Sequence, residues 1–174
     1  MFLEHGGVGG FGYTLADWSN FKRRAHGQKV PVYLLDPFVS RLVKAISAAG
    51  VGTHFSCDGH GKNRLTVGLS GKYNRAWFQL ILDIVQFEVK INSRFSINHH
   101  CYLNVYAPND DVLAVYEDVQ RVSAYLYDQR KFFGDLKQKT LNFLSESMVG
   151  GLDDKALYGF FKSEVLKQVN FIKN

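Results

Sequence analysis

Residues 51–69 decide the fold, and they read VGTHFSCDGHGKNRLTVGL. Two runs rich in β-branched and aromatic residues, 51–55 and 65–69, flank a polar segment that contains glycine. Runs of this kind on either side of a short glycine-bearing loop are typical of neighbouring β-strands. We therefore predict two central strands joined by a loop that spans Ser56 to Arg64.

A helix is predicted directly before these strands. Asp36-Pro37 supplies an N-cap residue followed by proline at the first helical position, and Gly50 stands where a left-handed residue often ends a helix. The apolar residues between them recur at helical spacing and are Phe38, Leu42, Val43 and Ile46. Residues 36–49 should therefore form an amphipathic helix.

The same patterns extend along the chain. Strands are predicted at 30–35, 91–97 and 102–106, and helices at 14–24, at 74–89 and from 108 onwards, with breaks near Gly134 and Gly150-Gly151. The order strand, helix, strand, strand, helix, strand is that of a ferredoxin-like split βαβ unit. We expect an α+β fold with a four- or five-stranded sheet, helices on one face and a helical C-terminal extension. Two αββ units are the alternative.

Length and composition favour one domain, because the chain has 174 residues and is 46% hydrophobic. The glycine-dense residues 1–13 are expected to be a flexible lead. Residues 14–174 are expected to form the domain, with the sheet in 14–107 and helices in 108–174. No run approaches the length of a membrane span, and the N-terminus lacks the cationic flank of a secretory signal. These features predict a cytoplasmic protein without membrane contact.

Charge and cysteine content narrow the classes of partner. The formal net charge is +5, and the resulting field favours anionic partners, whether an anionic small molecule, a nucleotide or nucleic acid. Cys57 and Cys101 are the two cysteines, too few for the disulfide scaffold of a small secreted protein. We therefore interpret both as thiols.

The loop after residue 55 gathers three residue types suited to chemistry: a thiol at Cys57, a carboxylate at Asp58 and an imidazole at His60. Glycines in such a loop can leave backbone amides pointing at an anion, and cationic side chains add donors. The first hypothesis is a pocket for a nucleotide or other phosphate-bearing ligand, in which Asp58 or His60 transfers a proton. Its ligand-binding residues would be Ser56, Gly59, Gly61, Lys62 and Arg64.

A second hypothesis is a site for zinc or another divalent metal. Cys57 and His60 have the separation of one half of a zinc site. The other half would come from His99, His100 or Cys101, which lie on a different connection between strands. His54 is a further candidate ligand, because alternate residues of a strand share a face and His54 would then lie beside Ser56.

A third hypothesis makes Cys57 a catalytic nucleophile, activated by His60 and by electropositive surroundings. The alternative without function is that Asp-Gly and His-Gly are ordinary turn residues and that the cysteine fills apolar space. The sequence leaves these readings open, and with them the question of whether the protein is an enzyme.

The stretch from Leu42 to Gly61, with its Ala49-Gly50 turn and the loop Ser56-Cys57-Asp58-Gly59-His60-Gly61, resembles small bacterial and phage proteins that show a helix, a strand and Ser-Cys-x-Gly-His. It resembles more distantly the wybutosine-synthesis methyltransferase family, in which arginine stands at the position of His60. The resemblance does not extend into the C-terminal helices. It implies a phage or mobile-element protein in which this loop is the functional site.

Two further surfaces suggest interactions. A basic cluster near Trp18 and Phe21 combines phosphate neutralisation with stacking, as nucleic-acid patches do, and its residues are Lys22, Arg23, Arg24 and Lys29. The alternative is a solvated helix end whose cations complement the helix dipole. Aromatic residues are frequent in the predicted C-terminal helices, where they belong to the core or to the seam of a homodimer or partner groove. These are Phe132, Phe133, Phe143, Tyr158, Phe160 and Phe161. A non-catalytic module that binds nucleic acid or protein is thus the main alternative function.

Overall fold

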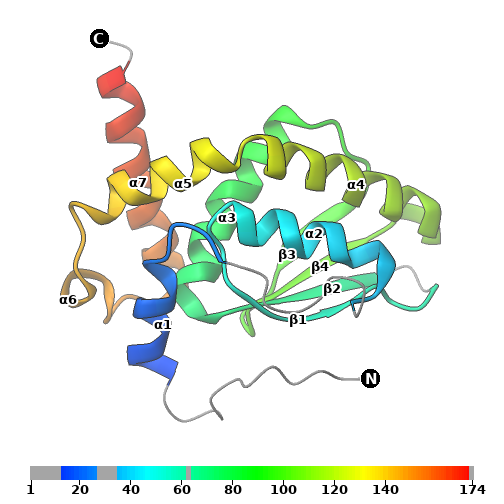
Figure 1. The fold of residues 1–174 in the computed structure, drawn as a ribbon, viewed down its shortest axis with the longest axis horizontal. Coiled ribbons are helices and arrows are strands. Elements are labelled where there is room, and N and C mark those ends of the chain that lie inside the picture. The colour runs from blue at the N-terminus through cyan, green and yellow to red at the C-terminus, as the bar shows by residue number, and fades with distance from the viewer. Residues whose placement is uncertain (1–12, 27–34, 62–63, 173–174) are drawn as a thin grey trace.

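The computed structural model describes residues 13–26, 35–61 and 64–172 (Figure 1). In chain order the described elements are α1 (Tyr13–Phe21), α2 (Pro37–Ala48), β1 (Thr53–Cys57), β2 (Arg64–Leu69), α3 (Gly71–Glu88), β3 (Arg94–Ile97), β4 (Tyr102–Tyr106), the 3-10 helix η2 (Pro108–Asp110), α4 (Val112–Asp128), α5 (Arg130–Leu141), α6 (Glu146–Val149) and α7 (Asp154–Ile172). The predicted mixture of helices and sheet is confirmed. None of the described helices has the length and apolarity needed to cross a lipid bilayer.

The four described strands form one antiparallel sheet in the order β1-β2-β4-β3. Two hairpins, β1–β2 and β3–β4, join through β2 and β4, where Arg64 pairs with Tyr106 and Gly68 with Tyr102. Each hairpin follows a helix, so α2-β1-β2 and α3-β3-β4 are two αββ units. This is the alternative that the sequence left open.

The ferredoxin-like order is not seen among the described strands. A split βαβ unit would place the predicted strand 30–35 beside β2. Residues 27–34 lie outside the described part of the chain, and β4 occupies the position next to β2.

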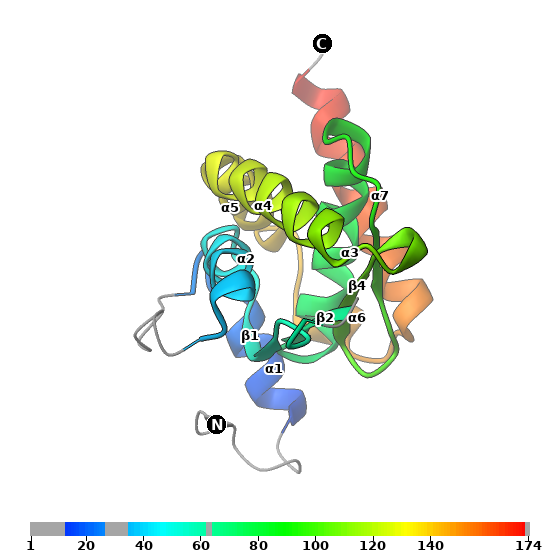
Figure 2. The same cartoon turned by 90° about the vertical axis from the view of Figure 1, so that its right-hand side faces the viewer.

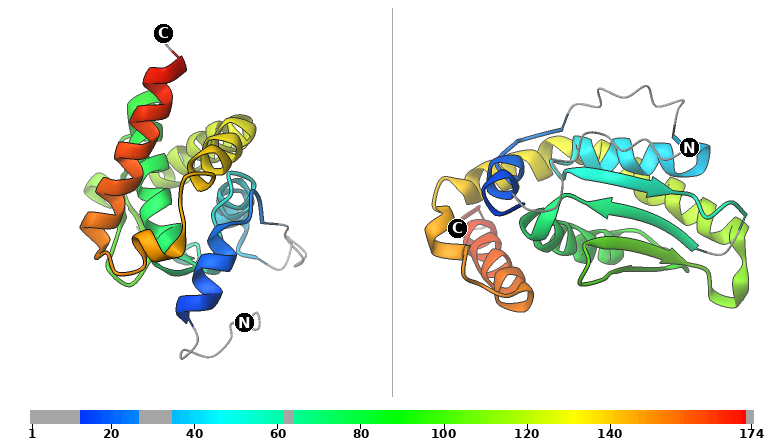
Figure 3. Two further views of the ribbon diagram at one scale, coloured as in Figure 1. Left: turned by 90° about the vertical axis from the view of Figure 1, so that its left-hand side faces the viewer. Right: turned by 90° about the horizontal axis from the view of Figure 1, so that it is seen from below.

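The helices α2, α3 and α4 lie on one side of the sheet, and the view from below faces the strands directly (Figures 1 and 3). Alternation along the strands explains this arrangement, because successive side chains point to opposite faces. The side chains that face the helices are fully buried and include Leu65, Val67, Leu103 and Val105. The residues between them form the opposite face of the sheet.

The helical part after residue 107 packs on the sheet-containing part. Helix α4 packs against α2 and helps to cover the sheet, so the helical C-terminal part shares the core of the preceding residues (Figure 2). The signal at residues 108–110 marks a short 3-10 helix, and the N-cap of α4 is Asp111, whose Oδ1 accepts from the Ala114 amide at 3.1 Å.

Aromatic side chains fill the space where α1, α3 and α7 meet. The ring of Phe21 lies 5.3 Å from that of Phe161 and 6.2 Å from that of Trp77, measured between centroids. Phe133 is also fully buried, whereas Phe132 and Phe143 are exposed. The predicted aromatic positions therefore divide between core and surface.

One predicted helix break is misplaced. The chain breaks at Gln129, between α4 and α5, and α5 continues through Gly134. A Cβ at Gly134 would lie 3.4 Å from Cγ of Arg24, an ordinary van der Waals distance, so packing does not require glycine at this position. The predicted break at Gly150-Gly151, between α6 and α7, is confirmed.

Candidate metal centre

Three side chains of the types that bind metals converge at one end of the β1–β2 hairpin. Asp36, Cys57 and His60 each present one ligand atom, and these three atoms all lie within 4.8 Å of one another. Asp36 precedes α2, Cys57 is the last residue of β1, and His60 is in the following loop. Asp36 and Cys57 are half-buried and His60 is exposed, so the cluster opens to solvent.

A left-handed turn folds the loop back on the strand. The φ angles of Gly59, His60 and Gly61 are 82°, 50° and 79°. Glycine adopts such angles without steric cost, whereas histidine does so uncommonly. The turn brings His60 back to the thiol of Cys57.

The loop amides donate to side chains of the cluster itself. The amide of Asp58 donates to Oδ2 of Asp36 at 3.2 Å, and the amide of Gly59 donates to Sγ of Cys57 at 3.4 Å. The amide of His60 donates to Oδ1 of Asp58 at 2.9 Å. Three successive amides are thus engaged by carboxylate and sulfur acceptors, and they do not form the cradle for an anion that the phosphate hypothesis expected.

The Asp58 carboxylate lies beside the His60 imidazole. Its side chain is 10% exposed, and its Oδ1 lies 3.6 Å from Nδ1 of His60, whose side chain is 74% exposed. A buried carboxylate beside an exposed imidazole can fix the orientation of the ring. The catalytic role of Cys57 stays a prediction: the ligand atoms of Cys57 and His60 lie within 4.8 Å, whereas activation of a thiol requires a hydrogen bond to the base.

The predicted second half of the metal site lies elsewhere. His99 and His100 belong to the β3–β4 loop, which is at the end of the sheet where Gly68 pairs with Tyr102, while the loop after Cys57 is at the opposite end. Their rings lie 3.7 Å apart and are exposed. A single site that joins Cys57 and His60 to His99 and His100 is not compatible with this placement, because the hairpins run antiparallel.

His54 does not share a face with Ser56. The register between β1 and β2 shifts between Thr53 and Phe55, as a β-bulge does. Ser56 pairs with the inward-facing Val67, whereas the His54 ring lies against Gly68 on the other side of the sheet. The bulge therefore removes His54 from the set of candidate ligands.

Of the other residues predicted to bind a ligand in this loop, Lys62 lies outside the described residues. Arg64 begins β2, is exposed, and places its Nε 3.5 Å from Oγ1 of Thr66. Cys101 is the second thiol, and burial raises its pKa.

The predicted basic patch is partly engaged within the protein. The guanidinium of Arg24 forms an ion pair with Asp135, and the carbonyls of Lys22 and Arg23 accept hydrogen bonds from α5 side chains. Lys29 lies outside the described residues. The side chains of Lys22, Arg23 and Arg24 remain exposed, as both interpretations of this cluster expected.

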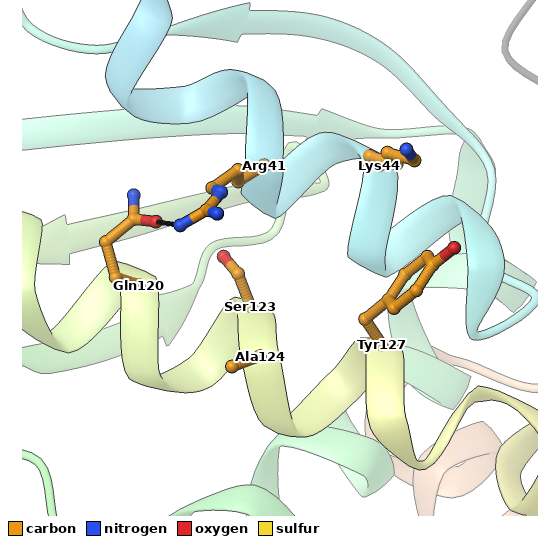
Figure 4. Close-up of a pocket in the computed structure, with 6 residues that line it drawn as sticks. All are labelled: Arg41, Lys44, Gln120, Ser123, Ala124 and Tyr127. Carbon is orange, nitrogen blue, oxygen red and sulfur yellow. Dashed lines mark hydrogen bonds between the residues drawn. The ribbon is translucent and has the colours of Figure 1, made fainter.

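A groove of about 310 Å³ lies between α2 and α4 (Figure 4). In it Nη1 of Arg41 donates to Oε1 of Gln120 at 2.8 Å. The Tyr127 ring is flanked by Lys44 at 5.7 Å and by Arg130 at 4.2 Å. The residues that line the groove are Arg41, Lys44, Gln120, Ser123, Ala124 and Tyr127, none of which belongs to the loop after β1.

The sequence predicted that Cys57 and His60 lie together, but it interpreted Asp36, the third member of the cluster, only as a helix cap. The Asp36 side chain makes no capping hydrogen bond to α2 and instead accepts from the loop. A tight turn at 49–52 makes α2 and β1 run in opposite directions, so the start of α2 lies beside the end of β1. Only this helix–turn–strand topology could have indicated that Asp36 lies near Cys57, because the spacing of residues along the chain does not.

Comparison with known proteins gives no relative, since no protein-family model, no curated protein and no solved structure matches this chain. The function is therefore inferred from the chemistry of the site.

Proposed function

We propose that the protein binds one divalent transition-metal ion, with zinc the preferred species, through Asp36, Cys57 and His60. The observation that carries this proposal is the convergence of a carboxylate, a thiol and an imidazole within 4.8 Å from two separate segments of the chain. A mixed set of sulfur, nitrogen and oxygen ligands suits zinc, whereas magnesium and calcium prefer oxygen alone. Zinc–ligand distances of roughly 2.0–2.3 Å require small side-chain movements in this cluster.

The surrounding hydrogen bonds support a cation rather than an anion. Backbone amides donate to the Asp36 carboxylate and to the Cys57 sulfur, which would fix both ligands in place. Asp58 lies on the Nδ1 side of His60, so Nε2 would be the nitrogen that binds the metal. Such outer partners orient ligands and raise metal affinity.

Three protein ligands leave a fourth position of a tetrahedral ion open to solvent, as in zinc sites that act on substrates. Water held there would be more acidic than bulk water. A phosphate-bearing ligand could replace that water and contact the exposed Arg64, which starts the next strand. The predicted nucleotide-like ligand would then bind through the metal and not through loop amides.

Isothermal titration of metal-free protein with zinc chloride tests the proposal. We expect one equivalent to bind, and Cys57→Ser and Asp36→Asn each to weaken binding at least about tenfold, because each removes a charged ligand. Asp36→Asn keeps an oxygen that can accept from the Asp58 amide, so it separates the ligand role of Asp36 from its structural role.

Cys101→Ser is the matched control, since Cys101 is also an unpaired, half-buried cysteine but lies at the other end of the sheet. It should leave zinc affinity unchanged. A wild-type protein that binds less than a tenth of an equivalent, or a Cys57→Ser variant that binds as tightly as wild type, would refute the metal site.

A further inference from the structure

The strand face opposite α2, α3 and α4 is the one seen from below in Figure 3, right, and its outward positions include arginine and tyrosine. The four described strands contain two arginines and no acidic residue. Both arginines alternate with the inward-facing apolar positions and therefore belong to this face. We call it the open strand face and define it by Phe55, Arg64, Arg94, Tyr102 and Tyr106.

A row of three side chains crosses the face at one end. Arg64 of β2 pairs with Tyr106 of β4, and Tyr106 pairs with Arg94 of β3. Directly opposed residues in a sheet have Cβ atoms about 4.5–5.5 Å apart. Tyr106 thus occupies the position between two arginines on neighbouring strands, and both arginines are exposed.

A second aromatic group lies at the other end of the face. Tyr102 is four residues before Tyr106 on the same strand, so the two rings are roughly 13 Å apart along it. The Tyr102 ring packs edge-on against Phe55, with centroids 6.1 Å apart, and lies 6.2 Å from the His54 ring. The β-bulge at His54 brings that ring to the same side.

We propose that the open strand face binds single-stranded nucleic acid. Arginines neutralise phosphates, and half-buried aromatic rings in a sheet provide planes on which unpaired bases stack. The face offers both, with cations beside one stacking position and a separate stacking position further along β4. The positive net charge of the chain favours the same anionic partner.

The face selects against duplexes, because the bases of a double helix are already stacked on each other and cannot reach the tyrosine rings. It is also distinct from the groove between α2 and α4, which lies in the helical layer (Figure 4). The inference does not require a bound metal, because none of the five defining residues is among the proposed ligands. Only Arg64 is shared with the proposed function, as the contact of a metal-bound phosphate.

Fluorescence anisotropy with a labelled ten-nucleotide uridine oligomer, in buffer containing EDTA, tests the inference. We expect Tyr102→Ala and Tyr106→Ala each to weaken binding by roughly 5- to 150-fold, the range for loss of one stacked base. Tyr106→Phe should retain most of the affinity, because it keeps the ring. The double variant Arg64→Gln, Arg94→Gln should also lower the slope of log affinity against log salt by about 1.4, since each phosphate contact contributes about 0.7 in a single strand.

The matched control is Arg41→Gln, Arg130→Gln, which removes the same charge from the helical layer and should leave the affinity within about twofold of wild type. Thymidine oligomers of equal length test whether the sugar matters, and binding of either single strand supports the inference. Three results would overturn the inference. The first is equal affinity for a duplex, and the second is unchanged affinity in a protein that carries both Tyr102→Ala and Tyr106→Ala. The third is a larger loss of affinity in the control variant than in Arg64→Gln, Arg94→Gln.

Discussion

Lys137 of α5 donates a hydrogen bond from its side chain to the carbonyl of Gly50, which follows the C-cap residue of α2. The same Nζ donates to the carbonyl of Arg23 at 2.9 Å and lies 4.4 Å from the centroid of the Phe21 ring. Lys137 is fully buried, and burial lowers its pKa to about 7. One amine therefore joins the ends of α1 and α2 to α5.

Replacing Lys137 by methionine should lower the free energy of unfolding by about 1–3 kcal/mol. Methionine keeps most of the side-chain volume, but the carbonyls of Arg23 and Gly50 lose their donor, and an unsatisfied buried acceptor is costly. Urea unfolding measures the change. Lys139→Met, an exposed position on the same helix, should change stability by less than about 0.5 kcal/mol. Equal losses in the two variants would contradict the assigned role.

The same lysine makes the free energy of unfolding depend on pH above about 7. Its folded pKa of about 7 lies below its ordinary value of 10.5. Between these values the unfolded chain binds a proton that the folded chain does not, so the free energy of unfolding rises with pH, by at most about 1.4 kcal/mol per unit. Below pH 7 both states are protonated and Lys137 adds no slope. The free energy of unfolding should be measured from pH 7 to 9 for both wild type and Lys137→Met. The difference between the two values should rise with pH.

His26 should weaken the fold in acid. Burial, together with the positive charges of Lys137 and Arg23, lowers its pKa from 6.5 to about 4. Within the described residues its buried Nε2 has no hydrogen-bond partner. Because the unfolded chain takes up the proton first, the free energy of unfolding falls as the pH drops from 6.5 towards 4. His26→Gln should flatten that part of the profile. A profile unchanged by the substitution would show that other groups cause the acid loss.

Gly71, the first residue of α3, should not tolerate a side chain. Its φ is +82°, and a Cβ there would lie 2.0 Å from Oδ1 of Asp17, whose Oδ2 accepts from the Lys72 amide at 3.0 Å. Gly61 is the matched control, since its φ is +79° and a Cβ there would meet nothing within 4 Å. Gly61→Ala should cost about 1 kcal/mol for the left-handed backbone. Gly71→Ala should cost at least about 1 kcal/mol more, because the carboxylate must move. Thermal unfolding of both variants separates the two effects.

Features encoded by neighbouring residues could be predicted from the sequence. Pro37 fixes the first turn of α2, and Gly50 ends it with a φ of +89°. The β-branched runs on either side of the cysteine loop form the predicted hairpin. In each case the residues that determine the feature are close together in the sequence. Their local conformational preferences are therefore enough to predict it.

The sheet order could not be predicted in this way. It depends on the pairing of β2 with β4, in which Gly68 meets Tyr102 across more than thirty residues of chain. The two strands belong to different hairpins, and no local pattern specifies which edges of the hairpins meet. Gly134 shows another limit, because its low helix propensity predicted a break, whereas α5 continues through it within the packed fold.

The two histidine groups of the sequence should separate cleanly in metal binding. His60 lies with Asp36 and Cys57, whereas His99 and His100 lie at the opposite end of the antiparallel sheet. We therefore expect His60→Ala to weaken zinc binding at least about tenfold, as loss of a ligand should cost no less than loss of an outer partner. The double variant His99→Ala, His100→Ala should bind zinc as wild type does. Zinc should also raise the thermal midpoint of this double variant but not that of His60→Ala, since a ligand that binds the folded state stabilises it. If the double variant lost zinc binding and His60→Ala kept it, the metal would bind at the β3–β4 loop instead.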